Sequence, residues 1–164
     1  MKIFVLPALV AILSGCVAPT DLMRDHQRII QEDGGFFYNT QTEMIDRSYA
    51  DVKSDLKTIA PRCFEKPASD QVTGIGRTTD RFVRFYPGKD EYAFILAYLF
   101  KLKDAPDHDS GHVLVAEVSS DSPTTTRIKT HHYHPPLAST YEPLSDVLLE
   151  WARNEHDMCL SHTN

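Results

Sequence analysis

Apolar residues recur along this chain with two different spacings, one typical of helices and one typical of strands. Between residues 40 and 60 they lie three and four positions apart, which predicts a helix with one buried stripe. Thr40 or Thr42 is the expected N-cap of this helix, and Pro61 is expected to end it. The stripe consists of Met44, Ile45, Tyr49, Val52, Leu56, Ile59, Ala60 and Cys63.

Beyond residue 70, short segments rich in Val, Ile, Tyr, Phe and Thr alternate with turn residues, which predicts strands. The expected strands cover residues 71–77, 80–86, 91–102, 112–118 and 124–134. A final segment, 141–158, returns to helical spacing. The pattern therefore predicts an α+β domain: an N-terminal helix, an antiparallel meander of four or five strands with one face covered, and a C-terminal helix.

The first fifteen residues have a different pattern. Lys2 precedes an apolar run at 3–13, which is too short to span a bilayer. The next residues, Leu13-Ser14-Gly15-Cys16, resemble the lipobox of bacterial lipoproteins. The resemblance implies cleavage before Cys16 and an N-acyl diacylglycerol anchor on it, whose two or three acyl chains hold firmly to a membrane. The alternatives are an ordinary signal peptide or a buried N-terminal strand.

The chain is therefore expected to divide into a signal peptide (1–15), a lipidated N-terminus with a tether (16–39) and a single α+β domain (40–164). Its 164 residues, 41% of them hydrophobic, suit one domain. Val17, where an Asp would favour the inner membrane, implies by the same resemblance the periplasmic face of the outer membrane. The net charge of −6 argues against a nucleic-acid partner and against adhesion to anionic lipid through a basic patch.

Three cysteines occur in the chain, and Cys16 is assigned to the lipid anchor. Cys63 and Cys159 remain, which is an even number in an oxidising compartment. We expect them to form a disulfide that joins the ends of the two helices. In the chain-entropy model, closing a loop of about 95 residues contributes at most about 4–5 kcal/mol. The alternative is two free buried thiols.

The segment HHYHPP (131–136) is the main candidate for metal chemistry. On a strand, His132 and His134 point to one face, and His131 and Tyr133 to the other. Two imidazoles can share Zn or Cu, although a site needs three or four ligands. The further ligands would come from His108, Asp109 or His112. The alternatives are a solvated strand end at which the histidines bind nothing, or a pH-sensitive surface.

Motifs for other chemistry are weak. TGIGRTTD (73–80) contains G-x-G but lacks the third glycine and the following helix of a dinucleotide site. No G-x-S-x-G surrounds a serine after residue 16. We therefore predict that the chain is not an enzyme, with a catalytic triad assembled in space left open.

The segment RFVRFYPG (81–88) alternates arginine with aromatic residues. On a strand, Arg81, Val83 and Phe85 face one side and the intervening residues the other. Aromatic residues and arginine are enriched at the centres of protein interfaces. A partner-binding surface is therefore expected at Arg81, Phe82, Arg84 and Tyr86. The alternative is core packing of an edge hairpin.

Three blocks of sequence, 47–64, 124–133 and 148–159, resemble a family of small uncharacterised bacterial lipoproteins. The shared features are a Tyr-bearing helix that ends in Cys, a Thr-x-Ile strand and a Trp-Ala helix that ends in Cys. The resemblance implies the same anchor and disulfide and no established activity. This chain departs from the family at Asn154-Glu155, which replace a glycine, and in the histidines of the strand.

Taken together, these features predict a non-enzymatic envelope lipoprotein. Its small periplasmic domain would act as a protein-binding or assembly module, with no cofactor besides the lipid. The alternative function is a metal-binding lipoprotein that uses the His131–His134 strand.

Overall fold

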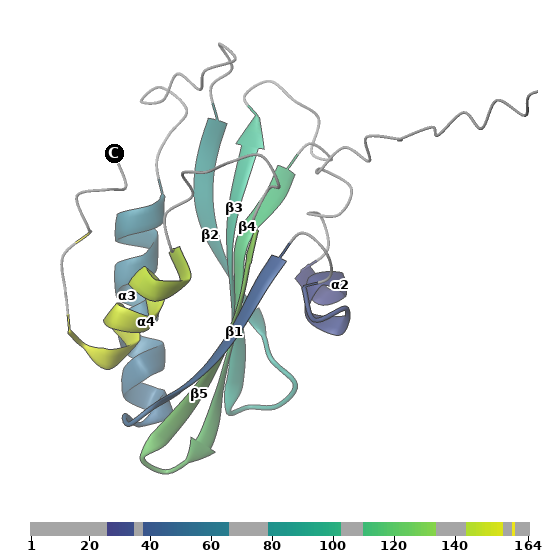
Figure 1. The fold of residues 1–164 in the computed structure, drawn as a ribbon. Helices are drawn as coiled ribbons and strands as arrows, with labels where there is room; N and C mark the ends of the chain where they lie inside the picture. Colours follow the sequence, from purple (N-terminus) through teal and green to yellow (C-terminus); the bar gives the residue numbers. More distant parts are fainter. Residues whose placement is uncertain are drawn as a thin grey trace, which may run out of the picture.

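The computed structural model of the chain describes residues 26–34, 38–65, 79–102, 110–133, 144–155 and 159. These parts form helices on both sides of an antiparallel sheet, which confirms the expected α+β class (Figure 1). The elements are α2 (His26–Gln31), β1 (Tyr38–Ile45), α3 (Tyr49–Phe64), β2 (Thr79–Pro87), β3 (Ala93–Leu102), β4 (Ser110–Ser122), β5 (Thr125–Tyr133) and α4 (Leu144–Arg153). The strand expected at 71–77 lies outside the described residues.

The sheet has the strand order β1-β5-β4-β3-β2. The strands β2 to β5 form the expected meander, since each pairs antiparallel with the next in the chain. The edge strand β1 does not belong to that meander, because it precedes α3 in the chain and pairs antiparallel with β5. As expected, the apolar segment 91–102 is an interior strand, β3, between β2 and β4.

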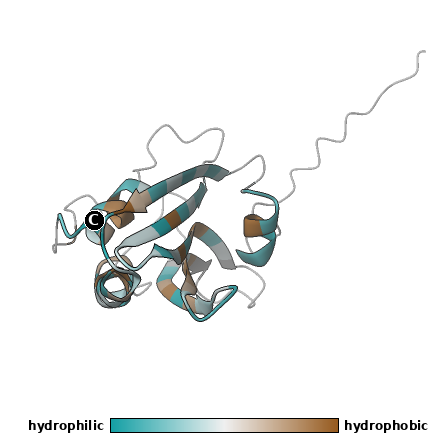
Figure 2. Ribbon diagram, turned by 90° about the horizontal axis from the view of Figure 1, so that it is seen from below, coloured by the Kyte–Doolittle hydropathy of each residue, from teal (hydrophilic) through white to brown (hydrophobic). Residues whose placement is uncertain are grey.

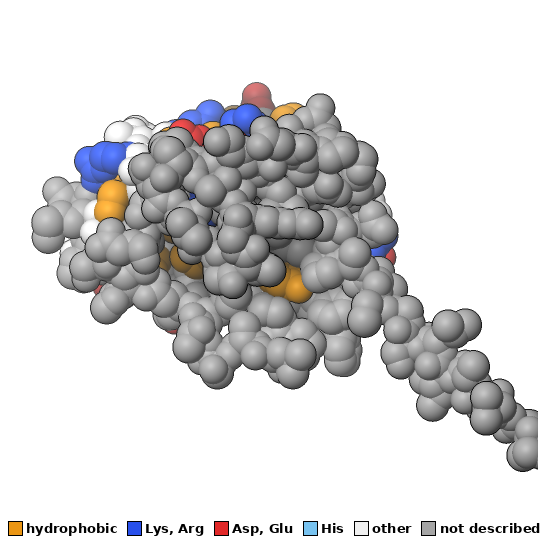
Figure 3. All heavy atoms as spheres, turned by 90° about the horizontal axis from the view of Figure 1, so that it is seen from above, with side chains coloured by type: hydrophobic (Ala, Val, Ile, Leu, Met, Phe, Trp, Pro, Cys, Tyr) orange, Lys and Arg blue, Asp and Glu red, His pale blue; other side chains and the backbone are white. Residues whose placement is uncertain are grey.

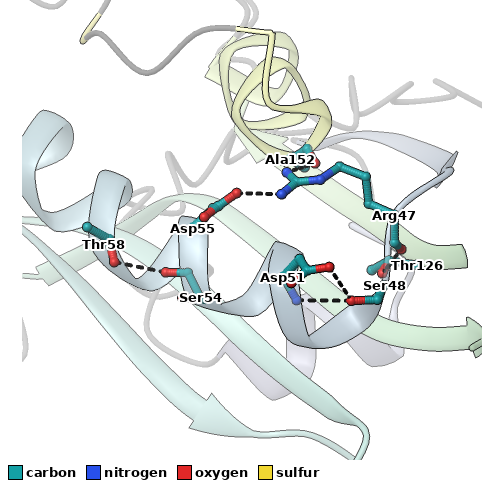
Figure 4. Close-up of polar contacts among 8 residues, drawn as sticks. All are labelled: Arg47, Ser48, Asp51, Ser54, Asp55, Thr58, Thr126 and Ala152. Carbon is teal, nitrogen blue, oxygen red and sulfur yellow. Dashed lines mark hydrogen bonds and ion pairs between the residues drawn. The ribbon is translucent and has the colours of Figure 1, made fainter. Parts of the chain in front are cut away.

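The helix predicted over 40–60 is wrong in its first part. Residues Tyr38–Ile45 form β1 instead, and the helix α3 begins at Tyr49. The N-cap is Ser48, whose side chain accepts a hydrogen bond from the Asp51 N–H, rather than Thr40 or Thr42 (Figure 4). Met44 and Ile45 fit either spacing, so only the pairing with β5 selects the strand.

Pro61 does not end α3, which continues to Phe64. Pro61 has no N–H to donate to the carbonyl of Lys57 four residues earlier, which is a cost to the helix at this position. The extension buries Cys63 and Phe64, and the Phe64 ring packs 4.6 Å from Tyr98 and 4.9 Å from Trp151. Core packing of Phe64 therefore outweighs the proline signal.

The larger core lies between the sheet and the helices α3 and α4, a side that we call the helix face. Its fully buried side chains include Leu56 of α3, Leu114 of β4, Ile128 of β5 and Trp151 of α4. Arg47 joins the layers from its position before α3, because its guanidinium contacts both the Asp55 carboxylate at 2.7 Å and the Ala152 carbonyl at 2.9 Å (Figure 4).

The opposite side of the sheet, which we call the α2 face, is covered by α2 over part of its area. This face was expected to be exposed, and that expectation is wrong where α2 packs on the sheet. Figure 2 shows α2 across the sheet from the other helices, with one hydrophobic band among hydrophilic residues. Ile29 of α2 packs in a second cluster with Tyr38, Ile95, Val115 and Tyr133. Residues 26–34, assigned to the tether on sequence grounds, therefore lie on the sheet.

Candidate functional site

The predicted disulfide is present. Cys63, at the end of α3, is bonded to Cys159, which follows α4, with their Cα atoms 5.1 Å apart. The anchor residue Cys16 and the signal peptide 1–15 lie outside the described residues. Among the residues that the structure describes, no helix is long and apolar enough to cross a membrane.

The four residues predicted to bind a partner do not form one surface. Arg81 lies on the same side of β2 as the buried Val83, whereas Phe82, Arg84 and Tyr86 point to the α2 face. The Tyr86 ring is already packed against another side chain there, because the His26 ring of α2 stacks on it with the ring centroids 4.0 Å apart. Phe82 and Arg84 remain, with the Arg84 guanidinium 4.8 Å from the Phe82 ring.

The main-chain edge of β2 is closed by side chains near Arg84. The Val83 N–H donates to Oε1 of Glu65 at 3.1 Å, and Nη1 of Arg84 donates to the Val83 carbonyl at 3.2 Å. Blocking an edge strand in this way prevents another strand from pairing with it. A partner would therefore meet the side chains of Phe82 and Arg84 rather than the backbone.

Among the described residues, Arg84 lacks the carboxylate partner that five other basic side chains on or near the sheet have. Basic and acidic side chains lie next to one another along the upper margin of the molecule in Figure 3. Ion pairs join Arg28 to Glu32, Arg47 to Asp55, Arg127 to Asp121, Lys129 to Asp33 and Arg153 to Glu43. Arg84 is exposed, and within the described parts of the chain it has no carboxylate partner.

The predicted metal ligands are only partly described, because His108 and His134 lie outside the described residues. His132 is buried on the helix face, beside Leu114 in the strand register. His112 is buried on the opposite face, where its ring centroid lies 5.9 Å from that of His26. The structure therefore does not bring His112 and His132 together, and no group of three metal-ligating side chains occurs within the described ranges.

A polar cluster beneath α2 was not predicted from the sequence. His131 of β5 is fully buried, and its two ring nitrogens contact neighbouring strands. Nε2 lies 3.3 Å from Oε1 of Glu117 on β4, and Nδ1 lies 3.1 Å from Oγ1 of Thr40 on β1. The Thr40 hydroxyl in turn donates to the Asp33 carbonyl at 2.9 Å. This chain of contacts connects the sheet to the residues that end α2.

Two further contacts hold the end of α2 in place. Asp33 and Gly34 have φ angles of 52° and 81°, and the Gly34 N–H donates to the Ile29 carbonyl, a left-handed helix end. A Cβ atom on Gly34 would lie 2.7 Å from Cβ of Tyr38 and 2.9 Å from Oγ1 of Thr40. Only glycine therefore allows α2 to lie this close to β1.

The carboxylate of Asp33 completes the attachment of α2, because it pairs with Nζ of Lys129 at 2.7 Å. Its hydrogen bond to Lys129 is the largest effect and lowers the pKa of Asp33 against the opposing effect of burial, and the charges of Lys129 and His131 lower it further. The carboxylate is thus ionised throughout the neutral range.

The order carboxylate, imidazole, hydroxyl in Glu117, His131 and Thr40 is that of a catalytic triad. The arrangement does not suit catalysis, however. Gly34 lies close to both Oγ1 of Thr40 and Nδ1 of His131, at the end of α2. The Thr40 hydroxyl also donates to Asp33 rather than being directed at a reacting atom. We therefore interpret the cluster as an attachment point for α2.

This cluster could hardly be predicted from the sequence. Its side chains come from residues far apart in the chain, and the register β1–β5–β4 alone brings them together. The one local indication is Asp33-Gly34 directly after a short helical segment, which is typical of a helix C-terminus. Nothing in the sequence shows that this helix packs on the sheet.

Comparison with known proteins adds little. Neither a known protein family nor a curated protein sequence matches the chain. A solved structure of a putative uncharacterized protein from Rhizobium leguminosarum is similar at 12% sequence identity and a TM-score of 0.41. The similarity covers 71% of this chain and 93% of that one.

Proposed function

We propose that this chain is a non-enzymatic lipoprotein of the bacterial cell envelope, held in the outer membrane by acyl chains on Cys16 with its domain in the periplasm. The lipobox-like segment ending at Cys16 supports the anchor. The disulfide between Cys63 and Cys159 is in keeping with an oxidising compartment. The Thr40 hydroxyl donates to the Asp33 carbonyl, which is in keeping with a non-enzymatic role.

The domain binds another envelope protein through Phe82 and Arg84. The observation that carries this proposal is the exposed guanidinium of Arg84, which stacks against the Phe82 ring and has no carboxylate partner among the described residues. Arginine next to an aromatic ring is typical of interface centres. Because Arg84 has no carboxylate partner among the described residues, we expect the binding partner to supply one.

Photo-crosslinking in the native envelope tests this function. A photoreactive amino acid replaces Phe82, and a second strain carries the probe at Ala50, an exposed position in α3 on the other side of the sheet. We expect one discrete adduct from position 82 and none from position 50. Adding Arg84→Glu to the first strain reverses the charge and should reduce the adduct at least tenfold.

Two outcomes count against the proposal. If position 82 gives no adduct, or if both positions give the same one, the β2 surface is not the binding site. If Arg84→Glu leaves the adduct unchanged, the guanidinium does not recognise a carboxylate. Metabolic labelling with a fatty acid tests the anchor separately, since Cys16→Ala should abolish incorporation of the label.

A further inference from the structure

The two edge strands of the sheet, β1 and β2, differ in what lies along their outer sides. On β2, Glu65 and Arg84 bond to the outward N–H and carbonyl of Val83, and the strand ends at Pro87, which has no N–H. Along the outer side of β1, the described parts of the chain place no such side chain. The β2 edge is therefore closed to pairing with another strand, and the β1 edge is open.

The backbone groups at the open edge can be identified from one contact. The Thr130 hydroxyl of β5 lies 3.5 Å from the Gln41 carbonyl, so this carbonyl points toward β5. Because the direction of the backbone groups alternates along a strand, the N–H and C=O groups of Thr40, Thr42 and Met44 point away from β5. None of these outward groups has a hydrogen-bond partner among the residues that the structure describes.

The strand β1 also lacks the features that usually keep an exposed edge from pairing. It runs beside β5 over Tyr38–Ile45 without a bulge, and it contains neither lysine nor proline. Its one charged side chain, Glu43, is paired on its own chain with Arg153 of α4. Met44 is 46% exposed, which is unusual for an apolar side chain in this domain. An uncharged, regular edge of this kind suits the addition of another strand.

The side chains of β1 favour a second copy of the same strand as the partner. They alternate between two faces, since Thr40 contacts His131 on the α2 face and Glu43 contacts Arg153 on the helix face. In an antiparallel pairing centred on Gln41, each side chain lies opposite one of compatible chemistry on the same face. The pairs are Tyr38 with Met44, Asn39 with Glu43, Thr40 with Thr42, and Gln41 with Gln41.

This register satisfies the charge and the apolar surface of the edge together. Glu43 lies opposite an uncharged amide, Asn39, whereas a pairing centred on Glu43 itself would bring two carboxylates together. The exposed Met44 side chain meets the aromatic ring of Tyr38, a favourable contact for a thioether. The two threonines can form a cross-strand hydrogen bond. The edge is therefore complementary to itself.

We infer that two copies of this chain pair through their β1 strands, antiparallel and centred on Gln41, to form one continuous sheet with five strands from each copy. The strand β2 then lies at both outer edges of the joint sheet, so both Phe82–Arg84 surfaces stay free. If those surfaces bind a protein as proposed above, the dimer presents two of them, and a partner with repeated sites is held more tightly.

Hydrogen exchange of the full chain at two protein concentrations tests the pairing. The chain is kept in detergent with micelles in large excess, so that copies do not share a micelle by chance. The readouts are the outward amides of Thr40 and Met44. We expect their protection to rise about tenfold from dilute to concentrated protein, by mass action. The inward amide of Gln41 should be protected at both concentrations, and sedimentation velocity should show the dimer directly.

A proline at the open edge should prevent the pairing. Thr42→Pro removes an outward N–H from each copy without removing a hydrogen bond to β5, so we expect only monomer. Thr42→Val is the matched control, because it changes the side chain but keeps the N–H, and it should form dimers as the wild type does. Protection of the α3 amides reports whether each variant is folded.

Charges at the centre of the pairing test the register and remain informative if Thr42→Pro fails to fold. Gln41 is exposed and lies opposite its own copy, in a non-hydrogen-bonded pair whose side chains approach closely. Gln41→Lys and Gln41→Glu each place like charges opposite one another, so each alone should weaken the dimer by about threefold or more. An equal mixture of the two variants should restore it.

Several results would overturn the inference. Protection of Thr40 and Met44 that is the same at both concentrations would mean that another segment of the chain covers the edge. Protection that appears only when another envelope protein is added would assign the edge to that protein. A dimer that Gln41→Lys strengthens would exclude the register, because the lysine would then lie opposite Glu43.

These measurements do not involve Cys16, Phe82 or Arg84. A chain that forms the β1 dimer but gives no crosslink from position 82 would refute the proposed binding surface and leave the dimer intact. A chain that gives the crosslink but stays monomeric at high concentration would refute the dimer alone.

Discussion

At the scale of single residues, the α2 face is organised by polar side chains buried beneath a short helix. Tyr38 donates its hydroxyl to the His112 carbonyl at 3.1 Å, and its ring lies 5.6 Å from that of Tyr133. Burial of this phenol, aided by Tyr133, raises its pKa well above the ordinary value of 10.

That shift makes stability depend on alkaline pH. Below pH 10 the phenol is neutral in both states, so its contribution is fully present. Above pH 10 the unfolded phenol ionises and the folded one resists, so stability is lost as the pH rises. Tyr38→Phe should therefore cost about 1 kcal/mol at pH 7 through the lost hydrogen bond, and the gap to wild type should narrow at pH 11.

Urea unfolding at pH 7 and pH 11 measures this difference. Tyr92→Phe is the control, because Tyr92 is 59% exposed and should show neither effect. A gap between wild type and Tyr38→Phe that is the same at both pH values would contradict the assigned burial of the phenol.

At the scale of elements, the boundary between β1 and α3 is set by Ser48. Its hydroxyl accepts from the Asp51 N–H at 3.3 Å and donates to the Asp51 carboxylate at 2.6 Å (Figure 4). The chain turns sharply here, so a strand and a helix with different neighbours follow each other within four residues. The cap stabilises the first turn of α3, whose amides would otherwise lack acceptors.

Ser48→Ala should lower the free energy of unfolding by about 1 kcal/mol, the usual contribution of an N-cap. Ser54→Ala serves as the matched control, because Ser54 is exposed within α3 and accepts a hydrogen bond from Thr58 only through its backbone carbonyl. Thermal unfolding distinguishes the two. Equal losses in both variants would mean that Ser48 does not act as a cap.

At the scale of the whole molecule, the disulfide connects the two helices of the helix face near their C-terminal ends. The two cysteines lie 96 positions apart in the sequence, and the segment between them includes the whole β2–β5 meander. A cross-link over so long a loop restricts the unfolded chain strongly.

Reduction of this bond should therefore lower the free energy of unfolding by about 2–5 kcal/mol. Urea unfolding with and without a reductant measures the change. The double variant Cys63→Ala with Cys159→Ala should unfold as the reduced wild type does and should not respond to the reductant. A wild type that is insensitive to reduction would show that the bond contributes nothing to stability.

Much of this architecture could be predicted from sequence where one local signal dominated. The segment 91–102 is apolar, aromatic and bounded by turns, and it is β3. Cysteine counting identified the bond between Cys63 and Cys159. Local signals failed at residues 40–48, because Met44 and Ile45 satisfy both the helical and the strand spacing. They also failed at Pro61, because the residues next to Phe64 in the sequence do not show that Phe64 packs in the core.

The sequence by itself determined the fold class, the meander and the disulfide, since these follow from periodicity, turn residues and cysteine number within short stretches. Only the tertiary structure decided that β1 pairs with β5, that α2 covers the second face and that His131 is buried between Thr40 and Glu117. The physical reason is that pairing and burial depend on contacts between residues up to 91 positions apart. No local pattern specifies such contacts.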